Sequence, residues 1–388
     1  MDRRQFILRG GALGCSVAAS PLITPIAMAS APWDTRLIVI LLRGAMDGLD
    51  AVRPVGDPDF AGLRPDITGS AAHHDLNGFF AMREDLGELM PMWQAGELSF
   101  VHAVSTPYRD KRSHFDGQDL LEAGIPSLEA GLRDGWLNRL IQTQGGLESN
   151  IAFAVGQEQM LILSGDAETS SWAPRRRLSL DPATERLLEL VMHDDPLFRE
   201  ASAAALDITE RIENSSGMMQ GQGGGSHRQL ARFTAARLRE ETRIASFSLT
   251  GWDTHLRQGR SISTPLRRLA STLVTLKEEL GDVWGKTAIV CMTEFGRTAR
   301  QNGSDGTDHG TGGAMVLAGG AIRGGQVVSD WPGLSEAQLY DRRDLLPTRD
   351  VRAHAAWIMR GLFGLPTSTF ETAVFPGLEM GADPGLLL

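Results

Sequence analysis

Short apolar runs alternate with amphipathic stretches along most of the chain. Residues 83–96 and 264–285 repeat leucine and other apolar side chains at the spacing of a helix face. The apolar runs between such stretches are continuous or rich in β-branched residues, as expected of strands covered on both faces; they are residues 36–42, 98–104, 150–156, 243–249, 287–292 and 313–320. This alternation predicts an α/β fold with a mostly parallel central sheet between layers of helices.

Residues 213–229 interrupt the pattern with a polar, glycine-rich segment. Such composition is typical of a mobile loop rather than of a strand or a helix. The alternation continues on both sides of it, so we expect one α/β domain over residues 30–388 that contains a flexible loop.

Composition bounds the class of protein. The chain has 388 residues, 42% of them hydrophobic, and a formal net charge of −10. This length and hydrophobic content allow a large buried core. Basic runs are short and scattered, so we expect no nucleic-acid partner.

The first 29 residues have the features of an export signal. Arg3 and Arg4 lie in a charged start, an apolar stretch follows, and residues 27–29 read Ala-Met-Ala. The paired arginines resemble the twin-arginine signal, which exports folded proteins. The apolar stretch contains two prolines and falls short of the ~20 residues of a membrane-spanning helix. We therefore expect a periplasmic or secreted protein without a membrane span after signal removal; a lipoprotein cleavage site at residues 12–15 is the alternative.

Removal of the signal leaves Cys291 as the only cysteine, so an internal disulfide cannot form. Cys291 lies in the apolar run TAIVCM. That context predicts a small buried hydrophobic side chain rather than a nucleophile.

Chemically active side chains follow the predicted strands at the point where each strand ends. The residues that we single out there are Asp47 after the first strand, Arg112, Ser113 and His114 after the second, Asp253 and His255 after the fourth, and Glu294 and Arg297 after the fifth. The carboxyl ends of parallel strands lie at one edge of a sheet, where such folds build their sites. We therefore expect these segments to converge.

The segment GTDHG, with Asp308 and His309, precedes a strand instead of following one. It reaches the same edge only when the strand 313–320 runs antiparallel to the others or the loop bends back. The flanking Gly306 and Gly310 allow the backbone to approach a ligand closely.

Each motif also has a purely structural interpretation. Asp253 suits the cap of a turn, Asp308 suits a tight turn, Glu294 suits an ion pair with Arg297, and Ser113 suits the N-cap of a helix that begins at His114.

Taken together, the motifs favour a site for a divalent cation or an anion. Histidine ligands suit zinc, manganese or iron, whereas carboxylates alone suit calcium or magnesium. The segment GWDTH (residues 251–255) carries Asp253 and His255. One ion shared by GWDTH and GTDHG requires that His255 and His309 lie within about 8 Å of each other.

Several longer motifs resemble those of a known family. They are LLRGAMDGLDAVRP, HAVSTPYRDKRSHFDGQDLLEAG, DGWLNR, GWDTH, MTEFGRTARQNGSDGTDHGTGGAMVLAGG and GGQVVSDWPGL. Together they resemble the exported bacterial domain-of-unknown-function family 1501, over about residues 36–363. That family is placed in the alkaline-phosphatase-like superfamily, so the resemblance implies a central sheet flanked by helices and a metal site.

The resemblance also implies roles for single residues. Asp47 resembles the first acid of the superfamily, with Asp50 and Arg43 as competitors for that place, and Ser113 resembles its nucleophile. Asp253 and His255 resemble a metal-binding pair of the superfamily, here with a shorter spacing. Glu294 resembles the acid at the end of a strand, and Phe295 replaces the histidine that follows that acid. His309 resembles the histidine that comes late in the superfamily sequences. The replacement at Phe295 removes a ligand from one metal, so a full two-metal site is not expected.

Three functions fit these observations. The first is a metal-dependent hydrolase of a phosphate, sulfate or related ester on a small or polymeric substrate, in which Arg112 or Arg297 neutralises the non-bridging oxygens. The second is an exported binding protein that keeps the metal or anion site without turnover and works with a partner protein. A phosphate-transferring mutase is the third, but it needs more substrate-binding residues than the sequence identifies.

Overall fold

The computed structural model describes residues 32–388 except 70, 110, 132, 146–148, 157–159 and 174–225. Its centre is a nine-stranded sheet with the order β11-β5-β10-β9-β1-β8-β6-β7, in which β12 pairs with β5. The strands are β1 (Arg36–Arg43), β5 (Leu98–Ser105), β6 (Ala152–Val155), β7 (Ser170–Trp172), β8 (Ile244–Thr250), β9 (Thr287–Met292), β10 (Gly313–Ala318), β11 (Gln326–Val328) and β12 (Arg349–Asp350).

All six apolar runs form strands of this sheet, and most neighbours are parallel. The strand β1 pairs in parallel with β8 and with β9, and β6 pairs in parallel with β8. The strand β10 runs antiparallel to both β9 and β5. The α/β prediction is therefore confirmed, and the antiparallel direction of β10 brings the segment before it to the carboxyl edge of the parallel strands.

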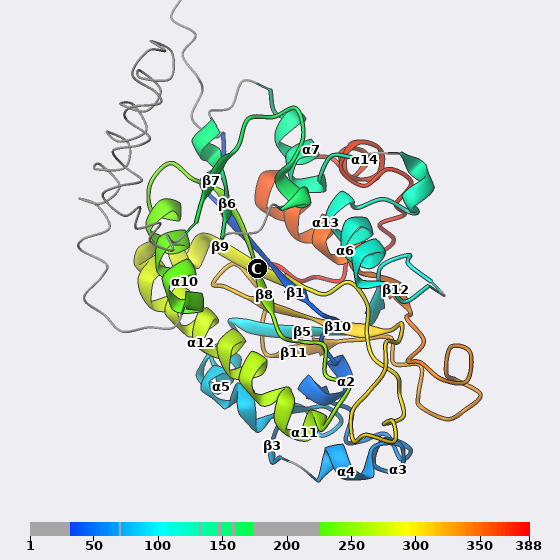
Figure 1. The fold of residues 1–388 in the computed structure, drawn as a ribbon. Helices are drawn as coiled ribbons and strands as arrows, with labels where there is room; N and C mark the ends of the chain where they lie inside the picture. The colour runs from blue at the N-terminus through cyan, green and yellow to red at the C-terminus, as the bar shows by residue number, and fades with distance from the viewer. Residues whose placement is uncertain are drawn as a thin grey trace, which may run out of the picture.

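Helices cover both faces of the sheet (Figure 1). The side chains of β1 alternate between two apolar cores: Leu37, Val39 and Leu41 pack with one group of helices, and Ile38, Ile40 and Leu42 with the other. The first group includes α7 (Trp136–Gln142) and α13 (Val351–Phe363), while the second includes α10 (Ser226–Leu238) and α12 (Ser263–Leu280). A continuously apolar strand is thus explained by burial on both sides.

The remaining helices and strands are short, and several of them surround the carboxyl edge. The segment after β1 forms a second sheet with the order β2-β4-β3. These elements are α2 (Gly48–Ala51), β2 (Val52–Arg53), α3 (Phe60–Leu63), α4 (Pro65–Thr68), β3 (His73–Asp75), β4 (Ala81–Arg83), α5 (Met90–Gln94), α6 (His114–Ala123), α11 (Gln258–Ser261) and α14 (Thr367–Thr369), with 3₁₀ turns at Glu84–Leu89, Leu128–Ala130, Ser149–Ile151, Leu161–Leu163 and Gly281–Lys286, and a π turn at Phe370–Val374.

The helix predictions hold with changed boundaries. The segment 83–96 is a 3₁₀ turn that passes into α5, with Pro91 in the first turn of α5, where its missing N–H costs no hydrogen bond. The helix α12 begins at Ser263, one residue before the predicted segment 264–285, and ends at Leu280.

The predicted loop 213–229 needs a correction at its end. Residues 226–229 form the first turn of α10, which packs along α12. His227 Nε2 lies 2.9 Å from Ser271 Oγ of α12, a tertiary contact that local composition does not reveal. Residues 213–225 and the export signal lie outside the described residues.

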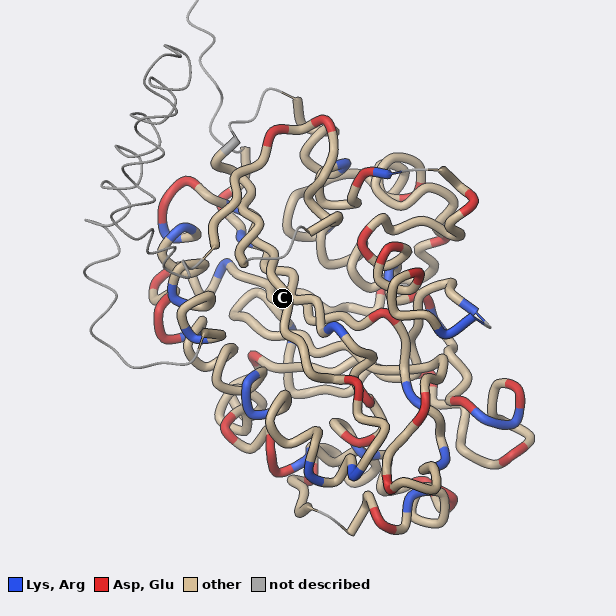
Figure 2. The backbone as a smooth tube through the Cα atoms, viewed as in Figure 1, with Lys and Arg blue, Asp and Glu red and all other residues tan. Residues whose placement is uncertain are grey.

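Charged residues alternate in sign along the outer loops and helices, while the central strands carry few of them (Figure 2). Cys291 is a buried free cysteine, as expected, and burial raises the pKa of its thiol. In the part of the chain that the structure describes, no helix has both the length and the apolar character of a membrane span.

Candidate metal centre

The GTDHG segment pairs with the loop after β9 instead of closing on itself. Gly310 N–H donates to Gly296 O at 2.8 Å, Gly296 N–H to Thr311 O at 3.0 Å, and Thr298 N–H to Asp308 O at 2.9 Å. A Cβ atom on Gly296 would lie 1.8 Å from the carbonyl oxygen of Gly312. The two loops therefore approach so closely that only glycine fits at position 296.

The same segment is also fastened to the loop after β8. Thr307 N–H donates to Thr254 O at 3.3 Å, and Arg257 N–H donates to Ser304 O at 2.9 Å. A Cβ atom on Gly306 would lie 2.1 Å from His255 O. These contacts place GWDTH directly beside GTDHG, which the spacing along the chain does not show.

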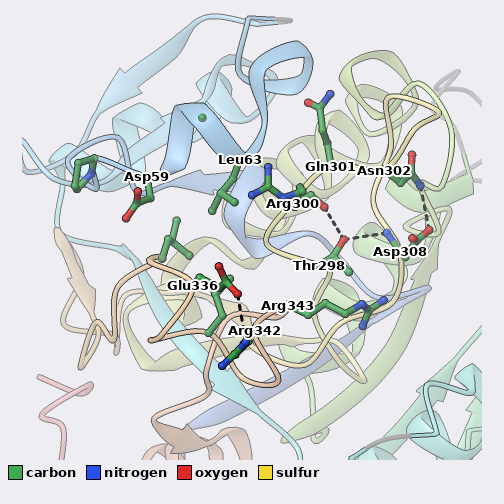
Figure 3. Close-up of a pocket in the computed structure, with 14 residues that line it drawn as sticks. Asp59, Leu63, Thr298, Arg300, Gln301, Asn302, Asp308, Glu336, Arg342 and Arg343 are labelled. Atoms are coloured by element: carbon green, nitrogen blue, oxygen red, sulfur yellow. Dashed lines mark hydrogen bonds and ion pairs between the residues drawn. The ribbon is translucent and has the colours of Figure 1, made fainter.

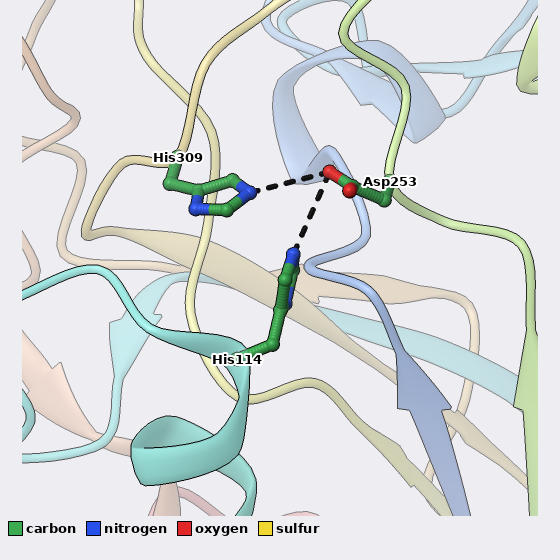
Figure 4. Close-up of side chains that lie close together, drawn as sticks. All are labelled: His114, Asp253 and His309. Carbon is green, nitrogen blue, oxygen red and sulfur yellow. Dashed lines mark hydrogen bonds and ion pairs between the residues drawn. The ribbon is translucent and has the colours of Figure 1, made fainter.

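A third segment enters at the N-terminus of α6. Ser113 is the N-cap, and its Oγ accepts a hydrogen bond from Asp116 N–H at 3.5 Å. The helix begins at His114, as predicted, and the His114 side chain points at Asp253 (Figure 4).

Three imidazoles surround one carboxylate oxygen. From Asp253 Oδ1, the Nε2 atom of His255 is 3.0 Å away, that of His309 is 3.2 Å away and that of His114 is 3.5 Å away. His255 Nε2 and His309 Nε2 are 3.0 Å apart, well within the separation that a shared ion allows. His114, Asp253 and His309 each offer a ligand atom within 4.8 Å of the other two.

The outer nitrogen of each ring is held by an oxygen that can only accept a hydrogen bond. A neutral ring that carries its proton on Nδ1 satisfies this contact and turns the Nε2 lone pair toward the centre, which is the tautomer that a metal ion at the centre selects. The Nδ1 contacts are 2.7 Å to Glu294 Oε1 for His114, 2.8 Å to Arg112 O for His309, and 3.2 Å to Asp308 Oδ1 for His255.

Converging lone pairs repel one another unless a positive charge lies between them. His114 Nε2 is also buried without a hydrogen-bond partner among the described residues. In a tetrahedral zinc site with bonds of about 2.0–2.1 Å, neighbouring ligand atoms are about 3.3 Å apart. The separations of 3.0–3.5 Å from Asp253 Oδ1 are close to that spacing. His114, Asp253 and His309, whose ligand atoms all lie within 4.8 Å of one another, therefore fit a transition-metal ion such as zinc.

Arg297 fixes the carboxylate of this cluster. Its Nη2 atom donates to Asp253 Oδ1 at 2.6 Å. Burial raises the pKa of Asp253, but this hydrogen bond and the charge of Arg297 outweigh it and lower the pKa to about 2. Asp253 is therefore an anion at any ordinary pH, as a metal ligand must be.

The surroundings of His114 and His309 act differently on their pKa values. The hydrogen bond to Glu294 raises the pKa of His114 against the opposing effect of burial. For His309, burial lowers the pKa and favours the neutral ring that binds metal. The hydrogen bond from Asn302 is the main cause that lowers the pKa of Asp308, so this carboxylate remains an acceptor for His255.

Asp47 does not join the cluster. It is buried, with 1% of its surface exposed, and its Oδ2 atom accepts from Arg64 Nη1 at 2.7 Å and from Gln258 Nε2 at 2.6 Å. Its backbone caps α2, and its Oδ1 atom accepts from Asp50 N–H at 3.2 Å. The structure thus places the predicted metal ligand Asp47 in a buried ion pair at the same edge of the sheet.

Glu294 and Arg297 do not form the ion pair that is the structural alternative for this motif. Arg297 is 1% exposed, and it donates to Asp253 and to the carbonyl oxygens of residues 44, 45, 252 and 307. Its donors are therefore occupied, and it is unavailable to neutralise substrate oxygens. Glu294 is the partner of His114 and lies behind it rather than among the inward-facing ligand atoms.

Arg112 and Ser113 lie next to the cluster. The carbonyl oxygen of Arg112 accepts from His309, while its guanidinium contacts Asp344 at 3.5 Å and its side chain is 31% exposed. Ser113 serves as the helix cap, and its N–H donates to Tyr108 OH at 2.8 Å. His114, predicted as a catalytic residue, is placed instead among the candidate metal ligands.

Phe295 occupies the space where the resemblance implies a histidine. Its ring stacks on His114 at 5.2 Å between centroids and tilts against His309 at 5.2 Å. Phe295 is 2% exposed. An apolar ring in this position orients the imidazoles but offers no lone pair, so the site suits one ion better than two.

Strained backbone lies in the segments that form the site. Arg112 has φ 53°, Arg257 has φ 45° and Asp305 has φ 56°, all in the left-handed region that disfavours side chains. Such strain costs about 1–3 kcal/mol per residue and collects at functional positions.

Sequence reasoning missed two supporting residues. Asn302 donates from Nδ2 to Asp308 Oδ1 and to His255 O, both at 3.0 Å. Gln118 donates to Glu294 at 3.2 Å. The dipeptide Asn302-Gly303 signals a turn, but no local signal connects Asn302 with a histidine from another loop.

The chain belongs to a family that carries no assigned activity. The model of the family described as "Protein of unknown function (DUF1501)" matches residues 103–355, more than half of the chain. No curated protein matches the chain.

Solved structures give distant similarities. A protein in the alkaline phosphatase superfamily from Vibrio parahaemolyticus is 11% identical with a TM-score of 0.37, over 87% of this chain and 68% of that one. The C-terminal periplasmic domain of EcEptC from Escherichia coli is 9% identical with a TM-score of 0.40, over 92% and 93% of the two chains. Phosphonoacetate hydrolase from Sinorhizobium meliloti 1021, in complex with phosphonoformate, is 14% identical with a TM-score of 0.27, over 69% of this chain and 57% of its own.

Proposed function

We propose that the protein is a metal-dependent hydrolase of phosphate, sulfate or related esters. The observation that carries this proposal is the convergence of three Nε2 atoms on Asp253 Oδ1 at 3.0–3.5 Å. Nitrogen-rich donor sets suit zinc or manganese and argue against calcium, which prefers oxygen ligands. When bound, such an ion supplies Lewis-acid polarisation of an ester oxygen.

The side chains around the cluster supply positioning. Asp253 is held as an anion by Arg297, and His114 is oriented by Glu294. Asp253 is 46% exposed and His255 is 39% exposed, so an ester can approach this side of the cluster. Arg112 is the arginine whose guanidinium is free enough to contact the non-bridging oxygens.

Ser113 is the proposed nucleophile because it precedes His114 at the N-terminus of α6. Backbone N–H groups at a helix N-terminus favour negative charge, which lowers the cost of a developing alkoxide or a bound anion. The hydroxyl also caps the helix, so a test has to separate the two roles.

The first experiment measures metal and turnover together. Protein purified without chelator is analysed for metal, then offered p-nitrophenyl phosphate, bis(p-nitrophenyl) phosphate and p-nitrophenyl sulfate. We expect close to one equivalent of zinc or manganese and hydrolysis that a chelator abolishes and zinc restores. Absence of a stoichiometric ion contradicts the metal centre, and a bound ion without hydrolysis contradicts the hydrolase.

The second experiment compares two substitutions of Ser113. Asparagine caps helices as well as serine does, whereas alanine costs about 1 kcal/mol at an N-cap. Ser113→Asn is therefore expected to keep stability and bound metal while it lowers turnover at least a hundredfold, and Ser113→Ala lowers both stability and turnover. Full turnover in Ser113→Asn would mean that Ser113 is a helix cap and not the nucleophile.

A metal-bearing binding protein without turnover is the second candidate function. The observation that favours it is the exposure of Phe115 and Leu256, which follow His114 and His255 and are 83% and 64% exposed. Exposed large apolar side chains are common at protein contacts. For this function we expect a protein that holds an ion but hydrolyses no ester of the panel. We also expect it to bind an exported partner protein, and Phe115→Ser to release that partner.

Export completes the proposal. We infer that residues 1–29 direct the chain to the periplasm or beyond by the twin-arginine route. Replacing Arg3 and Arg4 by lysine is expected to keep the protein in the cytoplasmic fraction, where cell fractionation and immunoblotting detect it. Unchanged export of the double variant contradicts this route.

A further inference from the structure

A cavity of about 630 Å³ adjoins the metal cluster. It lies between α3 with the turn before it, residues 298–302 and the loop 334–343 (Figure 3). The apolar side chains of Leu63 and Leu334 are in its lining. Its volume is in the range of small-molecule sites, about 300–1,000 Å³.

The cavity shares residues with the shell that holds the cluster. Asp308 and Asn302 both line it. Asn302 Nδ2 donates to Asp308 Oδ1 at 3.0 Å, and Asp308 Oδ1 accepts from His255 Nδ1 at 3.2 Å. A molecule in this cavity therefore lies within two side chains of the proposed ion, close enough to be part of the same substrate.

Three arginines line the cavity: Arg300, Arg342 and Arg343. The Arg343 side chain bonds Asp344 Oδ1 at 3.0 Å, and its charge contributes to the lowered pKa of Asp308 after the larger effect of Asn302. Arg342 meets Glu336 only at 3.7 Å, and both side chains are at least 75% exposed. Such an exposed pair contributes little stability.

Arg300 is the arginine with the greatest freedom. No hydrogen bond or ion pair of its guanidinium is found with the residues that the structure describes, and it is exposed. Its neighbours are nevertheless fixed, because Ala299 N–H donates to Arg343 O at 3.0 Å. This bond holds the two arginine-bearing segments side by side.

The acidic residues of the cavity are Asp59, Asp308 and Glu336, and Glu336 is the partner of Arg342. Asp59 lies at the end away from Asp308 in Figure 3, and Arg300 and Arg343 lie between the two ends. Asp308 keeps its negative charge, which the hydrogen bonds from Asn302 and His255 stabilise. Between Asp59 and Asp308, Arg300 and Arg343 therefore bring two positive charges toward a bound anion.

We propose that this cavity binds a second anionic group of the substrate. The preferred substrate is then an ester whose alcohol part carries another phosphate or sulfate group, with one anion at the metal cluster and the other at the three arginines. Arginine suits this role because its planar guanidinium donates two parallel hydrogen bonds to phosphate or sulfate oxygens. That the ligand is a substrate rests on the proposed hydrolase function, but the binding of an anion in the cavity does not.

The test compares two probes that differ by one phosphate group. Binding of fructose 6-phosphate and fructose 1,6-bisphosphate is measured by calorimetry on zinc-loaded protein with Ser113→Asn, so that turnover is suppressed. We expect the bisphosphate to bind at least tenfold more tightly, and this preference to weaken as salt is raised.

Substitutions in the cavity decide the result. Arg300→Ala and Arg342→Ala are each expected to reduce the preference to threefold or less, with zinc content and affinity for the monophosphate unchanged. Arg239→Ala, an exposed arginine at the end of α10, is the matched control and should keep the full preference.

The outcomes separate the inference from the function on which it rests. A preference that Arg300→Ala and Arg342→Ala leave intact, or equal affinity for both probes, overturns the cavity proposal even when esters are hydrolysed. A preference that the arginine variants lose, in a protein that hydrolyses no ester of the panel, supports the anion site and rejects the hydrolase.

Discussion

Asp47 and Asp253 both follow a strand of the sheet, but their neighbours give them different roles. Asp47 is 1% exposed and faces the guanidinium of Arg64, so its charge is balanced inside the protein. Asp253 is 46% exposed and faces three imidazoles as well as Arg297. The first carboxylate therefore contributes to folding, and the second is available to an ion.

The cluster predicts a direct effect of single ligands on bound metal. Asp253→Asn and His309→Ala each remove a donor from the group of His114, Asp253 and His309, so we expect zinc affinity to fall at least tenfold with the fold retained. Elemental analysis gives the metal content, and circular dichroism checks the fold. His73→Ala, an exposed histidine in β3, is the control and should bind zinc as the wild type does. Equal zinc content in all four proteins would falsify the assignment.

Asp47→Asn is expected to lower stability and to leave zinc binding unchanged. It leaves the Arg64 guanidinium buried, 0% exposed, without its counter-charge. Removing one partner of a buried ion pair destabilises a protein by about 3–5 kcal/mol. Urea unfolding measures this loss, and elemental analysis of the folded fraction should give the wild-type zinc content. A loss of zinc without a loss of stability would restore Asp47 as a ligand.

Most of the fold could be predicted because its signals are local. The strands are continuous apolar runs, and α6 begins where Ser113 caps it. The position of GTDHG before its strand left two possibilities, an antiparallel strand or a loop that bends back, and β10 is antiparallel. The choice of partner for each buried polar group could not be predicted, because it depends on tertiary contacts: Gln258, 211 positions from Asp47, completes the environment of that carboxylate.

For the candidate site, too, the segments could be predicted but the partners of the side chains could not. Sequence reasoning identified the loops and three of the four inward-facing donors as metal ligands, and it assigned His114 to catalysis. The structural alternative of an ion pair between Glu294 and Arg297 does not form, because Arg297 extends to Asp253 and Glu294 to His114 instead. A charged side chain can pair with a neighbour in the chain or with a distant residue, and its burial at the sheet edge determines which partner it reaches.

Gly296 tests whether the pairing of two loops builds the site. Its Cβ would lie 1.8 Å from Gly312 O, so Gly296→Ala has to separate the loops that carry Glu294 and His309. We expect zinc binding to be lost and stability to fall by several kcal/mol. Gly303→Ala is the control in the same region, since its Cβ meets nothing within 4 Å. Denaturant unfolding and zinc titration of both variants give the result, and equal zinc binding in the two contradicts the pairing.

His354 in α13 provides a prediction on pH. Burial lowers its pKa to about 3, and neither ring nitrogen has a hydrogen-bond partner among the described residues. Between its unfolded pKa of about 6.5 and a folded pKa of about 3, only the unfolded chain binds the proton. Stability therefore falls as pH is lowered through this window, by up to about 1.4 kcal/mol per pH unit.

His354→Leu removes that proton-binding difference and the two buried ring nitrogens. We expect it to raise stability by about 1–3 kcal/mol at pH 7 and to make the decline toward pH 4 shallower. Part of the decline should remain, because burial also lowers the pKa of His102 to about 4. Urea unfolding at several pH values measures both curves, and parallel curves for wild type and variant would show that His354 does not titrate in this way.

At the scale of the whole molecule, the cluster joins parts of the chain that are far apart. Residues 114, 253, 255 and 309 come from the N-terminus of α6, the loop after β8 and the loop before β10. An ion that binds all of them binds the folded chain and not the unfolded one. Linkage then stabilises the fold by about 2.7 kcal/mol when free zinc is one hundred times its dissociation constant.

We therefore expect zinc to raise the Tm of the wild-type protein by several degrees. Calcium should raise it less, because only one of the four donors is an oxygen. His309→Ala should lose most of the zinc-dependent shift, whereas Gly303→Ala should keep it. Differential scanning calorimetry at fixed protein concentration, with zinc varied around its dissociation constant, measures the shift and its saturation. A wild-type Tm that zinc leaves unchanged would mean that the three imidazoles meet around Asp253 for packing alone, and the pairing of GTDHG with its neighbouring loops would then be a structural feature without an ion.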